Sequence, residues 1–325
     1  MSTIDIERAR NTGWAFAKNQ NAIHAKCAHS TMSSACRWSL SDPFNDLPDR
    51  DAYAEKFWQP LVRAMPDLER RNDIFVAGEF NGKVWVASTG HYVGTFKEDW
   101  LGIPATRQVT FVRFGEILQI DDDKIVRGYL LLDIVGMARQ AGFNLIPECR
   151  GAELLAPPPT VQDGIRLSAS SHTETNTSAE LVNAMITGLL SYDQTSLESM
   201  YQEEFWDPNM MWYGPSGIGT ARSLSGFQQY HQIPFLKFVP DRMGGNHVAR
   251  FADGPYVASG GWPSIYATTS GADWISTPLP AGVSVTMRVM DFWRREGNLL
   301  KENWVFIDIP DLFRQCGINV FEELQ

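Results

Sequence analysis

The sequence predicts an α+β protein built from two tandem domains of one kind. The chain has 325 residues, a length typical of two domains of roughly 150 residues. An aspartate followed by a helical stretch and Gln-x-Gly ends each half, at Asp133–Gly142 and Asp308–Gly317, with the same internal spacing. In each half helical periodicity comes first and strand alternation follows. A repeat this long is a whole domain, and its element order indicates helices layered on a sheet.

In the first copy, apolar residues at helical spacing predict two main helices, and alternating apolar residues predict strands on both sides of an Asn81-Gly82 turn. Asn-Gly favours the tight turn of an antiparallel hairpin. The expected ranges are helices at 4–18 and 51–63 and strands at 73–80, 83–89, 108–119 and 124–133.

The second copy repeats this order. Thr177, with Glu180 three residues later, has the pattern of a helix-capping box, and Asp253-Gly254 takes the place of the hairpin turn. Further elements are expected as a helix at 225–237 and strands at 283–294 and 298–308.

Between the copies, residues 147–177 are rich in proline and then in serine and threonine and have no periodic apolar face. This composition is typical of a linker. We therefore predict domains at 1–148 and 178–325, joined by a linker at 149–177.

Composition excludes several classes of function. A net charge of −10 argues against a nucleic-acid partner, which requires a clustered basic face. No apolar run approaches the ~18 residues of a membrane span, and no secretory signal is visible, so we expect a cytoplasmic protein without a membrane partner. The four cysteines have no metal-ligand spacing, and no nucleotide-binding or zinc motif occurs. We therefore expect neither a metal nor a cofactor.

The order of the recurring residues resembles that of the SnoaL-like polyketide cyclases, within the nuclear transport factor 2-like superfamily. The residues that carry the resemblance are Trp212-Tyr-Gly-Pro215, Pro240-Asp241, Trp304-x-x-x-Asp308 and Leu312-x-x-Gln315-x-Gly317 in the second copy, and Pro66-Asp67, Gly90-His91, Asp133 and Gln140-x-Gly142 in the first. The resemblance implies two cone-shaped domains, each a curved antiparallel sheet packed on helices around a pocket. It also implies association through the sheets, so we expect an internal pseudo-dimer of the two copies, with further homo-oligomers open.

The first catalytic candidates are Asp308 and Asp133. On a strand, alternate residues share a face, so Glu302, Trp304 and Asp308 lie on one side. If that side is the concave one, an apolar surrounding raises the pKa of the aspartate toward values useful for acid–base work. The resemblance places the family's catalytic carboxylate at this position. The alternative is that each aspartate only caps the following helix.

Asp291 and Glu116 lie seventeen residues upstream of these aspartates, on the strand expected to pair with theirs. Two carboxyl groups in different environments allow one site to separate an acid from a base. The alternative is a surface carboxylate bound to a nearby arginine, Arg288 or Arg113.

A pocket for a flat apolar compound is expected from the abundance of aromatic residues. The candidate lining residues are Trp304, Tyr129, Trp212, Trp38, Trp262, His91, Asn246 and Asn72. A lone histidine, such as His231 or His247, is more often structural. The histidine that the characterised cyclases use beside their aspartate is replaced here by Gln119 and Arg294.

These residues lead to three hypotheses. The first is cofactor-free acid–base catalysis on a small hydrophobic carbonyl compound, in which an aspartate forms an enolate that closes a ring as in polyketide or ester cyclases. The second is a non-catalytic module that binds a metabolite or supports assembly. The third keeps the pocket carboxylate but makes the enzyme an isomerase, a dehydratase or a hydrolase.

Overall fold

The structure, a computed structural model, describes residues 3–21, 28–146, 150–152, 156–277 and 279–322, and it divides into two units. The first unit contains Met1–Leu145, Thr160–Ala169 and Asn319–Gln325; the second contains Ile146–Pro159 and Ser170–Ile318. The predicted linker is therefore shared between the units. The predicted boundary residues 148 and 149, and with them Cys27 and Cys149, lie outside the described residues.

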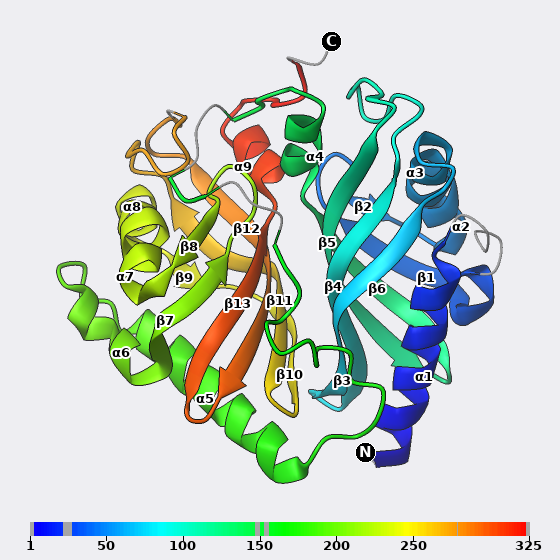
Figure 1. Cartoon of the computed structure of the whole chain (residues 1–325). Coiled ribbons are helices and arrows are strands. Elements are labelled where there is room, and N and C mark those ends of the chain that lie inside the picture. Colours follow the sequence, from blue (N-terminus) through cyan, green and yellow to red (C-terminus); the bar gives the residue numbers. More distant parts are fainter. Residues whose placement is uncertain (1–2, 22–27, 147–149, 153–155, 278, 323–325) are drawn as a thin grey trace. The chain divides into compact units, whose positions relative to one another are not determined.

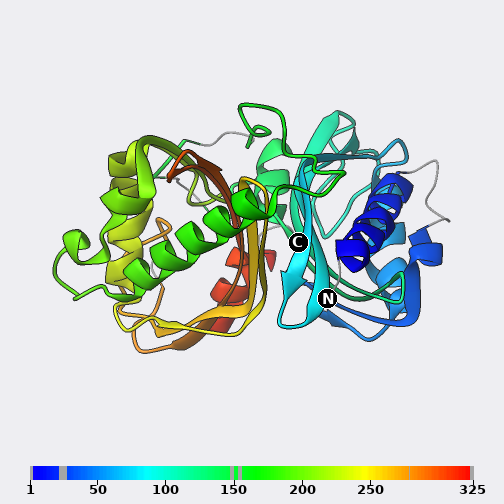
Figure 2. The ribbon, with the colours of Figure 1, turned by 90° about the horizontal axis from the view of Figure 1, so that it is seen from below.

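The first domain is a six-stranded sheet in the order β2-β1-β6-β5-β4-β3, with the helices of residues 3–64 gathered on one face (Figure 1 and Figure 2). Its helices are α1 (Thr3–Asn19), α2 (Arg50–Tyr53), α3 (Gln59–Ala64) and α4 (Ile134–Gln140). Its strands are β1 (Met32–Leu40), β2 (Asp46–Leu47), β3 (Glu69–Phe80), β4 (Lys83–Thr95), β5 (Val109–Asp121) and β6 (Lys124–Leu132).

The second domain is a seven-stranded sheet in the order β10-β11-β12-β13-β7-β8, with β9 paired to β11. Its helices are α5 (His172–Leu190), α6 (Gln202–Phe205), α7 (Ser223–Phe227), α8 (Ile233–Phe238) and α9 (Ile309–Gln315). Its strands are β7 (Trp206–Tyr213), β8 (Thr220–Arg222), β9 (Met243–Gly244), β10 (His247–Asp253), β11 (Tyr256–Thr268), β12 (Ser284–Glu296) and β13 (Leu299–Ile307).

The α+β fold class is confirmed, and the two domains share one order of elements, to which the second adds α6 and the short strand β9. One pairing in each sheet differs from the antiparallel prediction. β1 runs parallel to β6, and β7 runs parallel to β13. These two strands carry Trp38 and Trp212, and they precede the helical segment of their domain. Parallel neighbours require a long crossover, which the alternation within a strand does not reveal.

The helical segment after β2 or β8 has the same irregularity in both domains. π-helical turns at Ala54–Trp58 and Gln228–Gln232 interrupt it, each directly before a helix with proline at its first or second position. These prolines are Pro60 and Pro234. Proline has no backbone N–H to complete the α-helical ladder, so the recurring prolines account for the irregular turn.

The start of α5 corrects the linker prediction. The helix begins at His172, five residues before Thr177. The Thr177 hydroxyl donates a hydrogen bond to the carbonyl of Thr173, 2.9 Å away, so Thr177 lies inside the helix and does not cap it. Such hydroxyl-to-carbonyl bonds let a Ser/Thr-rich segment remain helical. No helix in the described part of the chain is long and apolar enough to cross a membrane.

Candidate active site

The second domain contains a cavity of about 210 Å³, lined by α5, by the helical segment from α7 to α8 and by strands of its sheet. Aliphatic and aromatic side chains make up most of the lining. The polar residues among them include Asp291, Asn303, Ser259, His231, His247 and Arg242. The cavity is thus an apolar space with a small number of groups capable of acid–base work or hydrogen bonding.

Asp291 is the only carboxyl group among the described lining residues. It lies on β12, opposite Ser259 of β11, and shares the cavity face with Val289 and Trp293. Burial among these neighbours raises the pKa of Asp291 from its ordinary value of 3.8 to about 7. The amide of Asn303, 3.4 Å from Asp291 Oδ1, and the nearby charge of Arg250 counter that rise only in part. Asp291 can therefore both accept and return a proton near neutral pH.

Two histidines line the same cavity. The π-helical turn carries His231, whose ring stacks on Trp212 with centroids 4.3 Å apart. Burial lowers the pKa of His231 to about 3, so the ring is neutral, and its Nδ1 has no hydrogen-bond partner among the described residues. His247 Nε2 lies 3.2 Å from the Ser264 hydroxyl, and burial lowers its pKa to about 4. Both rings are neutral hydrogen-bonding groups at pH 7.

Strand β13 presents Asn303, Val305 and Ile307 to the cavity. Because alternate residues face opposite sides of a sheet, Trp304 and Asp308 belong to the other face. The indole N–H of Trp304 donates to the carbonyl of Pro157, 2.9 Å away. Trp304 was expected to line the pocket but does not line this cavity. Strand alternation predicted which residues share a face, but it did not predict which face is concave.

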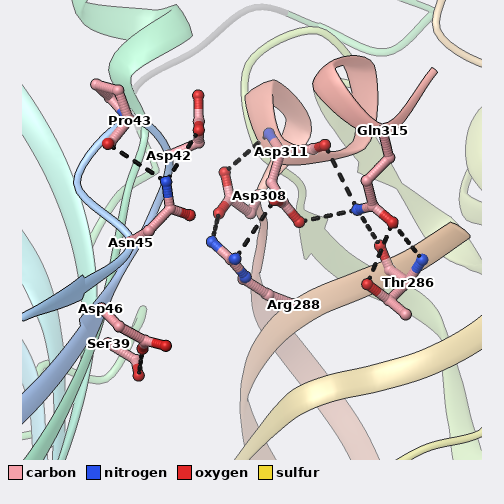
Figure 3. A network of polar contacts seen from close by, with 10 residues as sticks. All are labelled: Ser39, Asp42, Pro43, Asn45, Asp46, Thr286, Arg288, Asp308, Asp311 and Gln315. Atoms are coloured by element: carbon pink, nitrogen blue, oxygen red, sulfur yellow. Dashed lines mark hydrogen bonds and ion pairs between the residues drawn. The ribbon is translucent and has the colours of Figure 1, made fainter. Parts of the chain in front are cut away.

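Asp308 begins α9. Its carboxylate accepts a hydrogen bond from the backbone N–H of Asp311, and Arg288 Nη1 lies 3.1 Å from its other oxygen. Arg288 also contacts Asp311 at 3.4 Å (Figure 3). Asp308 is therefore both a helix cap and one half of a buried ion pair, and it does not line the cavity.

Gln315, at the other end of this motif, ties α9 to β12. Its side chain accepts from the backbone N–H of Thr286 at 2.8 Å and donates to the carbonyl of the same residue at 2.9 Å (Figure 3). Gln140 makes the matching pair of bonds with Phe111, at 2.8 and 2.7 Å. The glutamine of the recurring motif thus acts as an extra partner for a strand, a structural role.

Residues 20–141 match the family model of the SnoaL-like polyketide cyclases. The first domain is SnoaL-like. The second domain, which lies outside the matched residues, follows the same order of helices and strands apart from the added α6 and β9.

Three solved structures are each similar to a part of this chain. Wild-type IdmH from Streptomyces antibioticus is 18% identical, with 42% of this chain and 99% of that chain covered and a TM-score of 0.34. AclR from Streptomyces galilaeus is 16% identical, with 42% and 97% covered and a TM-score of 0.35. A phenazine biosynthesis-related protein from Pseudomonas aeruginosa is 17% identical, with 48% and 93% covered and a TM-score of 0.35. None of the curated proteins compared is a significant match.

Glu116 occupies the position in the first domain that Asp291 holds in the second. It lies opposite Ser88 on the neighbouring strand, as Asp291 lies opposite Ser259. Glu116, however, forms an ion pair of 2.7 Å with Arg70, and both side chains are at most 1% exposed. A guanidinium bound this closely occupies the carboxylate of Glu116.

Asp133 of the first SnoaL-like domain caps α4, with its carboxylate accepting from the backbone N–H of Gly136 at 2.9 Å. Burial lowers the pKa of the neighbouring Arg113 to about 10, and the charges of Asp133 and Asp73 oppose that shift. The capping alternative is thus realised for both recurring aspartates. A catalytic role for Asp133 remains a prediction.

Each remaining candidate of the first domain has a structural contact within that domain. Trp38 is buried and stacks on Tyr53 with centroids 4.1 Å apart. Tyr129 lies under the guanidinium of Arg127, at 4.6 Å. The other two contacts are His91 Nδ1 to Asp73 at 3.3 Å and Arg70 Nε to the side-chain oxygen of Asn72 at 3.0 Å.

Trp262 and Asn246 of the second domain lie beside each other but do not line the cavity. The Asn246 amide contacts the carbonyl of Trp262 at 3.4 Å, and Arg288 lies over the Trp262 ring at 5.2 Å. Arg294, which stands where the family's histidine is expected, pairs with Glu302. Of the predicted site residues, the cavity therefore brings together Asp291 and Trp212.

Sequence reasoning missed the role of five cavity residues: His231, His247, Asn303, Ser259 and Arg242. One signal for Asn303 was available. On an apolar strand, it alternates with Val305 and Ile307, as Asp291 does with Val289 and Trp293. The histidines and the arginine come from helix and edge-strand positions, whose side chains only the tertiary fold brings together.

Proposed function

We propose that this chain is a cofactor-free acid–base enzyme that acts on a small hydrophobic carbonyl compound in the cavity of its second domain, with Asp291 as the proton-transferring group. The observation that carries the proposal is a carboxyl group with a pKa of about 7 facing an apolar cavity. A general base works best when its pKa is close to the working pH.

The reaction that fits this group best is a ring closure of the cyclase kind. Ionised Asp291 removes a proton from the carbon next to a carbonyl, and the resulting enolate carbon attacks a second carbonyl of the same molecule. Protonated Asp291 then returns the proton to the new alkoxide, so that no other reactant is required. The cavity contributes by holding the two carbons together, which supplies much of the acceleration of an intramolecular reaction.

The developing negative charge on the enolate oxygen needs a hydrogen-bond donor. The candidates are the side chains of His231, Asn303 and Ser264, all of which line the cavity. Asn303 already donates to the carbonyl of Phe292 at 3.2 Å, whereas His231 has an unpartnered ring nitrogen. His231 is therefore the preferred donor, and its neutral ring offers one N–H.

Asp308, the leading candidate from the sequence, is the weaker choice of base. Its carboxylate is held by Arg288 and by the start of α9, and neither partner can be lost without disturbing the helix. The same reasoning applies to Glu116, which Arg70 occupies. We propose that the first domain has a supporting role.

The proposal can be tested without the natural substrate. The protein is incubated in D₂O with 2-tetralone, whose acidic hydrogens lie next to its carbonyl, and deuterium uptake is followed by proton NMR. We expect Asp291→Asn to lower the protein-dependent exchange rate by roughly 10²–10⁴-fold, the usual contribution of a positioned base.

Asp308→Asn is the matched control, because asparagine also caps helices. We expect it to exchange the ketone within about threefold of wild type, since such a change in rate corresponds to less than 1 kcal/mol. Full exchange in Asp291→Asn would contradict the proposal. Binding of 2-tetralone in the cavity without any exchange would favour the binding-module hypothesis.

A further inference from the structure

The cavity opens to solvent beside the end of α5 and strand β9. Two of its lining residues, Leu190 and Met243, are large apolar side chains that are 61% and 65% exposed. Arg242 precedes Met243 in the chain and also lines the cavity. The entrance therefore combines apolar side chains with one guanidinium.

Arg242 differs from the other cavity residues because it is a half-buried cation without a carboxylate partner among the described residues. Its Nη2 donates to the carbonyl of Leu189 at 2.8 Å, and its guanidinium lies 5.6 Å from the centre of the Tyr192 ring. Burial lowers the pKa of Arg242, and only the charge of Tyr192 opposes this. The guanidinium is thus partly removed from water, and its contacts offset only a part of the cost of this desolvation.

Three other buried or half-buried arginines of this domain are matched by acids, whereas half-buried Arg250 contacts the Ser259 hydroxyl at 3.4 Å. Arg288 pairs with Asp308, Arg294 pairs with Glu302 at the far face of the sheet, and Arg295 contacts Glu174 at 3.3 Å. A guanidinium has five N–H donors, and Arg242 uses one of them for Leu189. Donors remain for a further acceptor, and an anion is the acceptor that best offsets the desolvated charge.

A smaller hollow of about 120 Å³ lies on another side of Arg242 and is lined by Tyr192, Gln194 and Asp241 among others. The Asp241 carboxylate accepts a hydrogen bond from the backbone N–H of Thr268 at 2.8 Å, and this bond lowers its pKa. Asp241 does not line the main cavity. A ligand anion is therefore favoured on the cavity side of Arg242 and repelled on the side of the hollow.

We propose that Arg242 binds a carboxylate of the substrate at the cavity entrance, so that the substrate is an apolar ring compound with one carboxylate. The apolar part occupies the space lined by Trp212, Phe235 and Val289, and Arg242 fixes its orientation toward Asp291. This inference rests on the proposed use of the cavity as a substrate site.

The alternative is that Arg242 only caps the carbonyl end of α5, where a cation also interacts favourably with the helix dipole. The two roles predict different results in a ligand-binding experiment. A cap affects stability alone, whereas an anion site discriminates between a carboxylic acid and its neutral analogue.

The test measures binding of naphthalene-2-carboxylate and naphthalene-2-carboxamide by quenching of tryptophan fluorescence. We expect wild type to prefer the carboxylate, and Arg242→Gln to weaken carboxylate binding by roughly 10- to 100-fold, the range for hydrogen bonds to a charged group. Carboxamide binding should change by less than about threefold. Arg242→Lys keeps the charge but loses the planar fork. Its affinity for the carboxylate should lie between those of wild type and Arg242→Gln.

Arg222→Gln is the matched control, an exposed arginine of the same domain on β8 that does not line the cavity. Its carboxylate affinity should equal that of wild type. Equal affinity of wild type for the acid and the amide would overturn the inference, as would unchanged carboxylate binding in Arg242→Lys and Arg242→Gln. If Arg242→Gln does not fold, the acid–amide preference of wild type and its reduction in Arg242→Lys still decide the question.

Failure of this inference is distinguishable from failure of the proposed function. Asp291→Asn should lose proton exchange but keep its preference for the carboxylate over the carboxamide. Arg242→Gln should keep exchange of neutral 2-tetralone, because that ketone has no anionic group. Inorganic phosphate alone should not displace the carboxylate, since it lacks the apolar part.

Discussion

Replacing Asp291 with asparagine should stabilise the protein at alkaline pH. In the folded protein the pKa of Asp291 is raised from 3.8 to about 7, so the folded state binds this proton more tightly than the unfolded state does. The contribution of Asp291 to the free energy of unfolding therefore falls as the pH rises from about 4 to about 7, and it is constant above that range. Asparagine has no proton to lose, so the variant avoids this loss.

The size of the effect follows from the shift. About three pKa units correspond to about 4 kcal/mol by linkage. Roughly two of these units lie between pH 5 and pH 7 and correspond to about 3 kcal/mol. Asp291 is only partly buried and faces a cavity open to water. Water screens the charge, so we expect the advantage of Asp291→Asn over wild type to grow by on the order of 1–2 kcal/mol between pH 5 and pH 8.

The assay is urea unfolding of wild type and Asp291→Asn at pH 5, 6, 7 and 8. Asp308→Asn is the contrasting variant, because it loses an ion pair with Arg288 and should be less stable than wild type at pH 7. An advantage of Asp291→Asn that does not change between pH 5 and pH 8 would refute the argument. So would a variant less stable than wild type at pH 8.

Three further outcomes are expected. Glu116→Gln should destabilise the first domain by roughly 3–5 kcal/mol, because it leaves the buried Arg70 unpaired, and an unchanged urea midpoint would contradict this. Gln315→Leu should lower the free energy of unfolding by about 1–3 kcal/mol, because it leaves the backbone N–H and C=O of Thr286 without these hydrogen bonds. Amide exchange of α9 should then increase. Unchanged protection of α9 would refute the anchoring role. A chelator should change neither the melting temperature nor the 2-tetralone exchange rate, since no group of metal-binding side chains occurs among the described residues; a fall in either would contradict this expectation.

Much of the fold could be predicted from the sequence, because the recurring residues allow the two halves of the chain to be aligned with each other. Turns at Asn81-Gly82 and Asp253-Gly254 and the alternation of the long strands determined most element boundaries. Strands β1 and β7 were not predicted because their partners lie about 90 residues away in the sequence. Local periodicity carries no information on such a distant, parallel pairing.

The same comparison was misleading for the site. Recurrence drew attention to Asp308 and Gln315, yet these positions recur because both copies need the same helix anchored in the same way. Asp291 and Glu116 recur as acids but differ in environment, because Arg70 reaches only Glu116. Burial and ion pairing arise from the packing of distant segments, so the sequence alone could not rank the four candidate carboxylates, which include Asp133.

The dependence of 2-tetralone exchange on pH tests the central assignment most directly. If Asp291 is the base, the protein-dependent rate should rise with pH, reach half its maximum near pH 7, the pKa of Asp291, and level off above it. Asp291→Asn should show no such rise at any pH. A wild-type profile already level between pH 5 and pH 8, or a rise with its midpoint near 7 that persists in Asp291→Asn, would contradict the assignment of Asp291.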